Sequence, residues 1–216
     1  MGSSDGLLFV YSDPGTTPVA EFNDWYDNEH GPARLTVPGI SAGYRFLALD
    51  GQAPPWLAYY EMKSGVLDSA EYKALWAAAS AREKTIMSSL ATLDRRVYEL
   101  ISDSDSAGSP DSLAAPAVVL AVSLSVPPTM EDDLAAWYAD EHIPMLLAVP
   151  GWQRIRRYRL TAGTAPAYLS LHSLASMAVF DEPGYRAAVS TPWQKRIVDA
   201  AIGRERRVFG LHKSFG

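Results

Sequence analysis

The stretch WYDNEHGPARLTVPG at residues 25–39 returns 112 residues later as WYADEHIPMLLAVPG at residues 137–151. After this shift, nine of the 16 positions from residue 25 to residue 40 are identical. The identical residues are Trp25, Tyr26, Glu29, His30, Pro32, Leu35, Val37, Pro38 and Gly39. Self-similarity of this kind inside one chain predicts two copies of one structural unit.

The similarity continues on the C-terminal side of the quoted stretches. With one inserted residue, Tyr72 matches Tyr185, and near the ends RRVYEL (95–100) matches RRVFGL (206–211). The repeat therefore covers a whole unit and is not confined to one motif.

The segment SDSDSAGSPDSLAAP at 102–116 separates the two copies. It is polar and rich in Ser, Gly and Pro, a composition that predicts a flexible linker. We therefore predict a first unit over residues 5–101 and a second unit over residues 117–213.

Both units show the same pattern in their first half. Short apolar runs predict strands at 6–12 and 117–126. Helix-start signals and helical periodicity follow in each copy, up to the Glu-His pair. We expect Pro32 and Pro144 to end these helices, because the residue before a proline avoids the α region. The VPG that follows predicts a turn.

The second half of each unit predicts a β-hairpin, a helical region and a last strand. The helical regions are residues 69–90 and 182–202, the latter broken in two by Pro192. The resulting β-α-β-β-α-β order is that of a ferredoxin-like unit. One such sheet has helices on one face only, and a second copy can cover the other. The predicted fold class is α+β, with tandem ferredoxin-like units forming an intramolecular pseudo-dimeric α/β barrel.

The twin units, with E-H-x-P-x-x-x-x-V-P-G at the end of each first helix, resemble the dimeric α/β-barrel superfamily. The resemblance is nearest to its EthD-like branch, with two copies fused in one chain. It implies a pocket between each sheet and its own helices, with His30 and His142 at the functional position. Members of the superfamily include polyketide cyclases, decarboxylases, quinol-forming monooxygenases and haem enzymes.

A helical wheel places Glu29 in the middle of an apolar face and His30 at its edge, and the second copy repeats this with Glu141 and His142. A buried carboxylate needs a partner. Each glutamate could pair with the aligned arginine of its unit or accept backbone N–H bonds from the following turn, and each histidine could simply sit at a helix C-terminus. Alternatively, the Glu-His pair faces a cavity, where the imidazole acts as general acid or base and the glutamate orients it.

Further side chains are candidates for substrate binding. They are Tyr26, Tyr138, Tyr60, His172, Arg45 and Arg157. His172 and Tyr60 could instead be satisfied polar groups of the core, and the arginines could pair with the glutamates or with an anionic ligand. Because the copies differ at Gly31/Ile143, Arg34/Leu146 and Tyr60/His172, we expect the two pockets to differ.

Composition excludes several classes of function. The net charge of −6 argues against nucleic acid as a partner. The chain has no Cys, which excludes thiolate catalysis and cysteine metal sites. The sequence shows no metal-ligand spacing, phosphate loop, nucleophile elbow, signal peptide or membrane span, so we expect no metal, no cofactor, no membrane partner and a cytoplasmic location.

These observations predict a cofactor-independent enzyme of the lyase or isomerase type. It would decarboxylate, dehydrate or cyclise a small hydrophobic compound, aromatic or polyketide-like, of the kind used in secondary metabolism. His30 or His142 would transfer the proton, with Tyr or Arg groups holding a developing oxyanion. The alternatives are a non-catalytic or stress-related binder of hydrophobic ligands and a haem-binding protein. A homodimer of the chain is compatible with either class.

Overall fold

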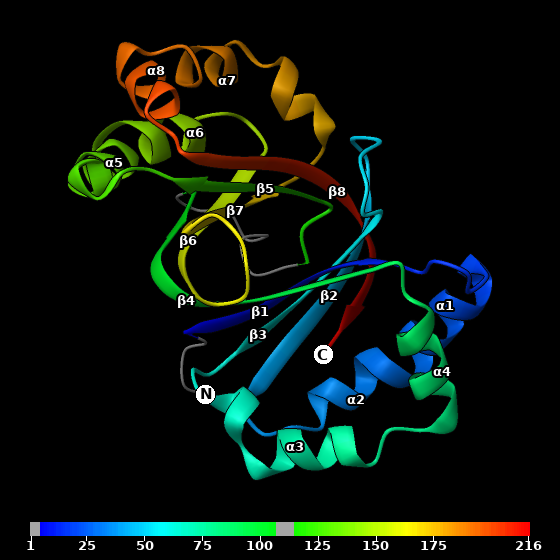
Figure 1. Ribbon diagram of the computed structural model, residues 1–216. Coiled ribbons are helices and arrows are strands. Elements are labelled where there is room, and N and C mark those ends of the chain that lie inside the picture. Colours follow the sequence, from blue (N-terminus) through cyan, green and yellow to red (C-terminus); the bar gives the residue numbers. More distant parts are fainter. Residues whose placement is uncertain (1–4, 107–114) are drawn as a thin grey trace. The chain divides into compact units, whose positions relative to one another are not determined.

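The computed structural model describes residues 5–106 and 115–216 (Figure 1). The contacts between residues divide this part of the chain into two units. Unit 1 contains residues 5–99, 161–164 and 209–216, and unit 2 contains the remaining described residues between 100 and 208.

Unit 1 begins with β1 (Gly6–Asp13), followed by helix α1 (Val19–Trp25), a π-helical turn η1 (Tyr26–His30) and α2 (Gly31–Leu35). Strands β2 (Ile40–Ala48) and β3 (Trp56–Met62) form a hairpin. A short 3₁₀ turn η2 (Val66–Asp68), helices α3 (Ala70–Ala77) and α4 (Ala81–Ser89), and the long strand β4 (Thr92–Asp105) follow.

Unit 2 repeats this order. It contains β5 (Val118–Ser125), η4 (Pro128–Met130), α5 (Glu131–Trp137), the π-helical turn η5 (Tyr138–His142), α6 (Ile143–Leu147), β6 (Trp152–Ala162), β7 (Tyr168–Leu174), η6 (Met177–Asp181), α7 (Pro183–Ala188), α8 (Pro192–Asp199) and β8 (Gly203–Phe215). The last segment of β8 belongs to unit 1, just as the last segment of β4 belongs to unit 2.

All strand pairs with an assigned register are antiparallel. In unit 1, β1 pairs with β3 and β4, and β2 pairs with β3 and the end of β8. In unit 2, β7 pairs with both β5 and β6. The described strands follow the order of a closed barrel, β1-β3-β2-β8-β5-β7-β6-β4. The predicted α+β class and the ferredoxin-like order of both units are confirmed.

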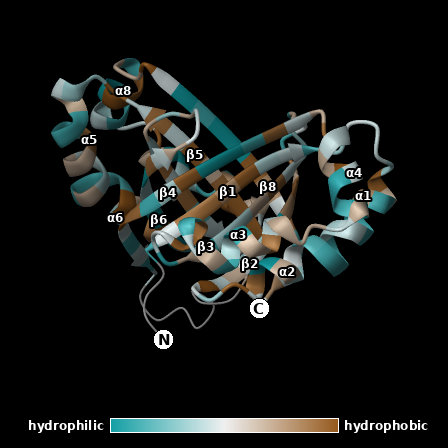
Figure 2. Ribbon diagram, turned by 60° about the horizontal axis from the view of Figure 1, so that its bottom comes forward, coloured by the Kyte–Doolittle hydropathy of each residue, from teal (hydrophilic) through white to brown (hydrophobic). Residues whose placement is uncertain are grey.

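Each unit has its own core between its sheet and its helices. In unit 1, Leu8 of β1, Trp25 of α1 and Ile86 of α4 belong to one buried cluster. In unit 2, Leu120 and Trp137 have the corresponding places. Strand β1 is largely hydrophobic, whereas the helices alternate between hydrophilic and hydrophobic residues (Figure 2). Each large apolar side chain buried in this way contributes about 2 kcal/mol to folding.

Two details of the helices differ from the prediction. Pro32 and Pro144 do not end the first helix of their units, because each lies in the first turn of a further helical segment, where a missing N–H is tolerated. The helical region 69–90 is two helices, because the hydroxyl of Ser80 accepts the N–H of Glu83 and starts a new helix.

The predicted linker starts too early. Residues 102–105 continue strand β4 instead of leaving the sheet, and residues 107–114 lie outside the described part of the chain. Residues 102–105 alternate between half-buried and exposed positions and are all polar, and this is why the sequence predicts a loop there.

The turn after α2 depends on a glycine. Gly39 has a φ of +96°, and its carbonyl accepts the N–H of Lys63 at 2.8 Å, which ties the turn to the end of β3. A Cβ at this position would lie 2.6 Å from a methyl carbon of Val66. Both the backbone angle and the space therefore require glycine.

We expect Gly39→Ala to lower the free energy of unfolding by about 2–4 kcal/mol, from a left-handed backbone and a clash together. Gly51→Ala is the matched control, because Gly51 has a φ of +69° and an added Cβ would meet no atom within 4 Å. It should lose only the backbone contribution, about 1–2 kcal/mol. Urea unfolding measures both, and equal losses would show that Val66 does not restrict the turn.

Candidate functional site

A π-helical turn in the first helix of each unit decides which side chains face the sheet. In unit 1 the N–H of Gly31 donates to the carbonyl of Tyr26, and in unit 2 the N–H of Ile143 donates to that of Tyr138. Each bond spans five residues instead of four. The extra residue rotates the following side chains back by about 100° compared with a regular α-helix.

This rotation turns the histidines inward. His30 is 8% and His142 is 9% exposed, whereas Glu29 and Glu141 are only partly buried. The wheel prediction, with glutamate at the centre of the apolar face and histidine at its edge, is therefore wrong. It assumes 3.6 residues per turn throughout the helix.

Both glutamates accept a hydrogen bond from the residue that caps the last helix of their unit. Glu29 accepts from the hydroxyl of Ser80, and Glu141 accepts from the hydroxyl of Thr191 at 2.6 Å. A carboxylate is favoured near the N-terminus of a helix. The glutamates thus tie the first helix to the last one, and the prediction that they orient the neighbouring imidazoles is corrected.

In unit 1 the carboxylate that reaches the imidazole is that of Glu83. Its Oε1 lies 3.1 Å from Nδ1 of His30 and 3.6 Å from the guanidinium of Arg34. The Arg34 guanidinium lies 3.4 Å from the same Nδ1. Because a carboxylate only accepts and its contact is the shorter one, the proton of the neutral ring is assigned to Nδ1. Burial lowers the pKa of His30 to about 4, although the hydrogen bond to Glu83 opposes this. The same bond lowers the pKa of Glu83.

The cavity beside His30 is filled by side chains of unit 1. Its volume of about 40 Å³ holds a few water molecules but no organic ligand. The guanidinium of Arg34 lies 4.7 Å from the ring centre of Trp76, and the hydroxyl of Tyr60 donates to that of Tyr26 at 3.1 Å. All these residues line the cavity.

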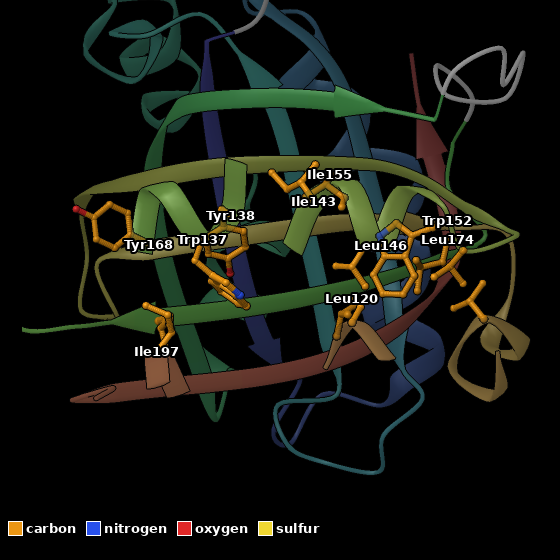
Figure 3. Packing of buried hydrophobic residues seen from close by; sticks show 14 of the residues in the cluster. Leu120, Trp137, Tyr138, Ile143, Leu146, Trp152, Ile155, Tyr168, Leu174 and Ile197 are labelled. Carbon is orange, nitrogen blue, oxygen red and sulfur yellow. The ribbon is translucent and has the colours of Figure 1, made fainter. Parts of the chain in front are cut away.

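The corresponding cavity of unit 2 has a volume of about 300 Å³, which is in the range of small-molecule sites. Its walls are mainly aromatic and aliphatic. Figure 3 shows Trp137 next to Tyr138, and Leu146 beside Trp152. The polar lining residues are Tyr138, His142, His172, Tyr185, Gln194, Arg204 and Arg206.

Exchanges between aligned residues explain why the two cavities differ. Three of them place a smaller side chain in the wall of unit 2, and one replaces a carboxylate by an amide. The exchanges are Trp76 to Val189, Tyr60 to His172, Arg34 to Leu146, and Glu83 to Gln194. Unit 2 therefore lacks the large side chains that fill the cavity of unit 1, and it lacks the ion pair of Glu83 and Arg34.

Two neutral histidines face the cavity of unit 2. His142 stacks on Trp137 with ring centres 4.2 Å apart, and burial lowers its pKa to about 4, although the backbone of Ala188 opposes this. Nδ1 of His172 accepts the indole N–H of Trp152 at 3.3 Å, so its proton is on Nε2. Burial, reinforced by nearby His142, holds the pKa of His172 well below its usual range.

The charged groups in this lining are cationic. Arg206 donates to the hydroxyl of Tyr185 at 3.4 Å, and Arg204 is largely exposed. Among the described residues that line the cavity, none is a carboxylate. The electrostatic field therefore favours a ligand with an anionic group.

Arg45 and Arg157 lie outside the lining of both cavities. Each is positioned against the tyrosine of the π-helical turn in its own unit, 4.5 Å and 3.9 Å from the ring centre. Arg45 donates to Asp27 at 2.8 Å, so the salt bridge considered between Arg45 and Glu29 is wrong.

Of the residues singled out from sequence, the structure brings Tyr138, His142 and His172 together around one cavity. It separates Glu141 from them by directing it to Thr191. Sequence reasoning missed Glu83 and its counterpart Gln194. The signal was present in SARE (80–83) and TPWQ (191–194), which are capping-box patterns that start a helix.

Among residues 5–106 and 115–216, no three His, Asp or Glu side chains are grouped so that they could hold a metal ion. None of the helices in this part of the chain combines the length and the apolar composition of a membrane span.

Comparison with known proteins places the fold. No family model and no curated protein matches the chain. An anthrone oxidase-like protein is similar in structure, with a TM-score of 0.67, 13% identity, and coverage of 99% of this chain and 95% of that one. A mutant chlorite dismutase from Candidatus Nitrospira defluvii gives a TM-score of 0.63 at 9% identity, covering 99% and 93%.

A putative monooxygenase from Fusobacterium nucleatum gives a TM-score of 0.58 at 11% identity, with 98% of this chain and 94% of that chain covered. Identities this low carry information about the fold and not about the reaction. Together with the strand order, these similarities show that the chain has the dimeric α/β-barrel fold.

Proposed function

We propose that the protein is a small-molecule enzyme whose active cavity is that of unit 2. Its substrate would be a hydrophobic compound, aromatic or polyketide-like, with an acidic or enolisable group. The observation that carries this proposal is the cavity of about 300 Å³, in which two neutral histidines and two arginines line an otherwise mainly apolar wall. Neutral imidazoles can accept a proton at neutral pH.

Dehydration and aldol-type cyclisation both begin with removal of a proton from an activated carbon, whereas decarboxylation ends with protonation of one. In the proposed reaction, the unprotonated nitrogen of His142 takes a proton from carbon next to a carbonyl group. The electron pair moves to the carbonyl oxygen, where Nε2–H of His172 and the guanidinium of Arg206 stabilise it. In dehydration the imidazolium gives this proton to the departing hydroxyl group, which leaves as water, and in cyclisation it protonates the alkoxide formed when the carbanion closes the ring onto a second carbonyl. In decarboxylation the bond from carbon to the carboxylate breaks with release of carbon dioxide, and a protonated His142 gives its proton to the resulting enolate. No cofactor is consumed in these steps.

The low pKa of His142 fits this role only with substrate present. An anionic group that enters the cavity favours the charged imidazolium and raises the pKa of His142 toward neutrality. The base is thus strengthened when the substrate is bound.

We also propose that the chain belongs to the EthD-like branch, on the E-H-x-P-x-x-x-x-V-P-G motif in both copies. The two units would descend from one duplicated and fused unit. The π-helical turn occurs at the aligned position of each copy, 112 residues apart, and this supports the proposed origin.

A second candidate function is non-catalytic binding. It is favoured by Gln194, which stands where unit 1 has Glu83, so that His142 has no carboxylate partner among the residues that line the cavity. Haem is a less suitable ligand, because about 300 Å³ is at the lower end of small-molecule sites. A visible absorption spectrum of the purified protein tests haem directly.

The first test concerns the cavity. We expect an enolisable polyketide without a carboxylate group, such as an anthrone, to raise the melting temperature of the wild type. We expect Val189→Trp, which copies Trp76 of unit 1, to abolish the shift. At a hundredfold excess over Kd, binding stabilises the fold by about 2.7 kcal/mol. Trp76→Val is the matched control in unit 1 and should leave the shift in place. A shift that survives Val189→Trp would locate binding elsewhere.

The second test concerns catalysis. His142→Gln should keep ligand binding and reduce kcat/KM by about 10²–10⁴, because the proton acceptor is lost. His30→Gln, the corresponding change in unit 1, should leave the rate unchanged. Product formation followed by mass spectrometry distinguishes the outcomes. Full activity in His142→Gln rejects the proposed mechanism, and binding without any turnover in the wild type favours the binding protein.

The third test concerns protonation. Because the pKa of His142 falls from 6.5 in the unfolded chain to about 4 in the folded one, the unfolded state binds more protons below pH 6.5. Stability is thus lost as the pH falls, by about 1.5 kcal/mol between pH 6.5 and pH 5 for this residue. Urea unfolding of His142→Gln and His142→Leu should show a shallower pH slope in both. An unchanged slope would mean that His142 is not buried as a neutral group.

A further inference from the structure

A buried arginine of unit 1 is surrounded by its own polar partners. Arg45 is fully buried and donates to Asp27 at 2.8 Å and to Asn23 at 2.7 Å. The other carboxylate oxygen of Asp27 lies 2.8 Å from Nε2 of His212. The charge of this guanidinium is therefore matched inside the unit.

Arg157 holds the same position in unit 2. It pairs with Ser170 in the β6–β7 ladder as Arg45 pairs with Ala58 in the β2–β3 ladder. It lies 3.9 Å from the ring centre of Tyr138, and only 6% of its surface is exposed.

All three polar partners are exchanged for apolar residues in unit 2. With the repeat offset of 112, Asn23 and Asp27 correspond to Ala135 and Ala139, and the match of RRVFGL with RRVYEL makes Ile101 the counterpart of His212. Both alanines are exposed, and Ile101 is 46% exposed. The three residues that correspond to the partners of Arg45 are thus apolar and exposed to solvent.

Arg157 has no acidic partner within the described residues. Burial lowers its pKa, and the groups that act on it are the ring of Tyr138 and the hydroxyls of Tyr138 and Tyr168. An arginine nevertheless stays protonated, and an almost buried charge without a counter-charge costs several kcal/mol. A bound anion would remove this cost.

We propose that unit 2 binds the carboxylate of a small ligand at Arg157, in the position that the Asp27 side chain takes in unit 1. The planar guanidinium matches a carboxylate in geometry as well as charge. The apolar part of the ligand would lie on Ala135, Ala139 and Ile101. The chemical class is therefore a small monocarboxylate with an aliphatic or aromatic group.

This site is separate from the cavity proposed for catalysis. Arg157 is not among the residues that line that cavity. Tyr138 is the residue that the two sites share, because it lines the cavity and its ring contacts the guanidinium of Arg157. The inference therefore stands whether or not the proposed enzymatic function is correct.

The experiment measures melting temperature in sodium acetate and sodium benzoate against sodium chloride at equal ionic strength. We expect the carboxylates to raise the melting temperature of the wild type, by about 5 °C or more at a hundredfold excess over Kd. Ala139→Asp supplies the carboxylate of unit 1 and should raise the melting temperature in chloride while removing the response to carboxylates. Val189→Trp, which closes the cavity, should keep the response.

Asp27→Ala is the reverse exchange in unit 1. It should lower the melting temperature in chloride. Acetate should then partly restore the melting temperature, because the variant has a second site for a carboxylate. The proposal is overturned if acetate, benzoate and chloride give the wild type the same melting temperature. It is also overturned if Ala139→Asp responds to carboxylates as the wild type does, or if Val189→Trp abolishes the response, which would place the anion in the cavity.

Discussion

The organisation of each unit depends on one backbone hydrogen bond, the one that closes its π-helical turn. The N–H of Gly31 donates this bond in unit 1, and the N–H of Ile143 donates it in unit 2. An α-helical turn at the same place would aim a glutamate at the sheet and leave the histidine at the margin. The wider turn reverses this order. It buries an imidazole that tolerates the neutral state, and it gives the carboxylate to the cap of the last helix, where the helix dipole stabilises it.

The π-helical turn does not determine which side chains surround the buried imidazole, and these side chains differ between the two units. Unit 1 surrounds His30 with Glu83 and Arg34, a buried charged cluster that excludes a ligand. Such a cluster contributes little net stability, but removing one member would leave a charge unpaired. Unit 2 has no buried ion pair at this place, because Gln194 and Leu146 stand where unit 1 has Glu83 and Arg34. A cavity remains there.

The fold could be predicted from sequence because its signals are local and occur twice. Apolar runs mark the strands, and the repeat shows where each unit begins. The site is less accessible to such reasoning. The periodicity of a π-helical turn differs from 3.6, so a regular wheel gives the wrong directions for Glu29 and His30. The partner of His30 is 53 residues away, in a contact that no local pattern encodes. Size exchanges such as Trp76 to Val189 are visible in the aligned copies, but their effect requires knowing that both line a wall.

Unit 2 differs from unit 1 in the same way at two separate places. The side chains that line the cavity beside His142 are smaller and the ion pair of Glu83 and Arg34 has no counterpart there, and among the described residues Arg157 lacks the counter-charge that Asp27 gives to Arg45. At each place a buried polar group of unit 2 has fewer polar partners than its counterpart in unit 1. This lowers the free energy of unfolding when no ligand is bound. The two proposed ligands would complete the interactions of His142 and Arg157 that unit 1 makes with its own side chains.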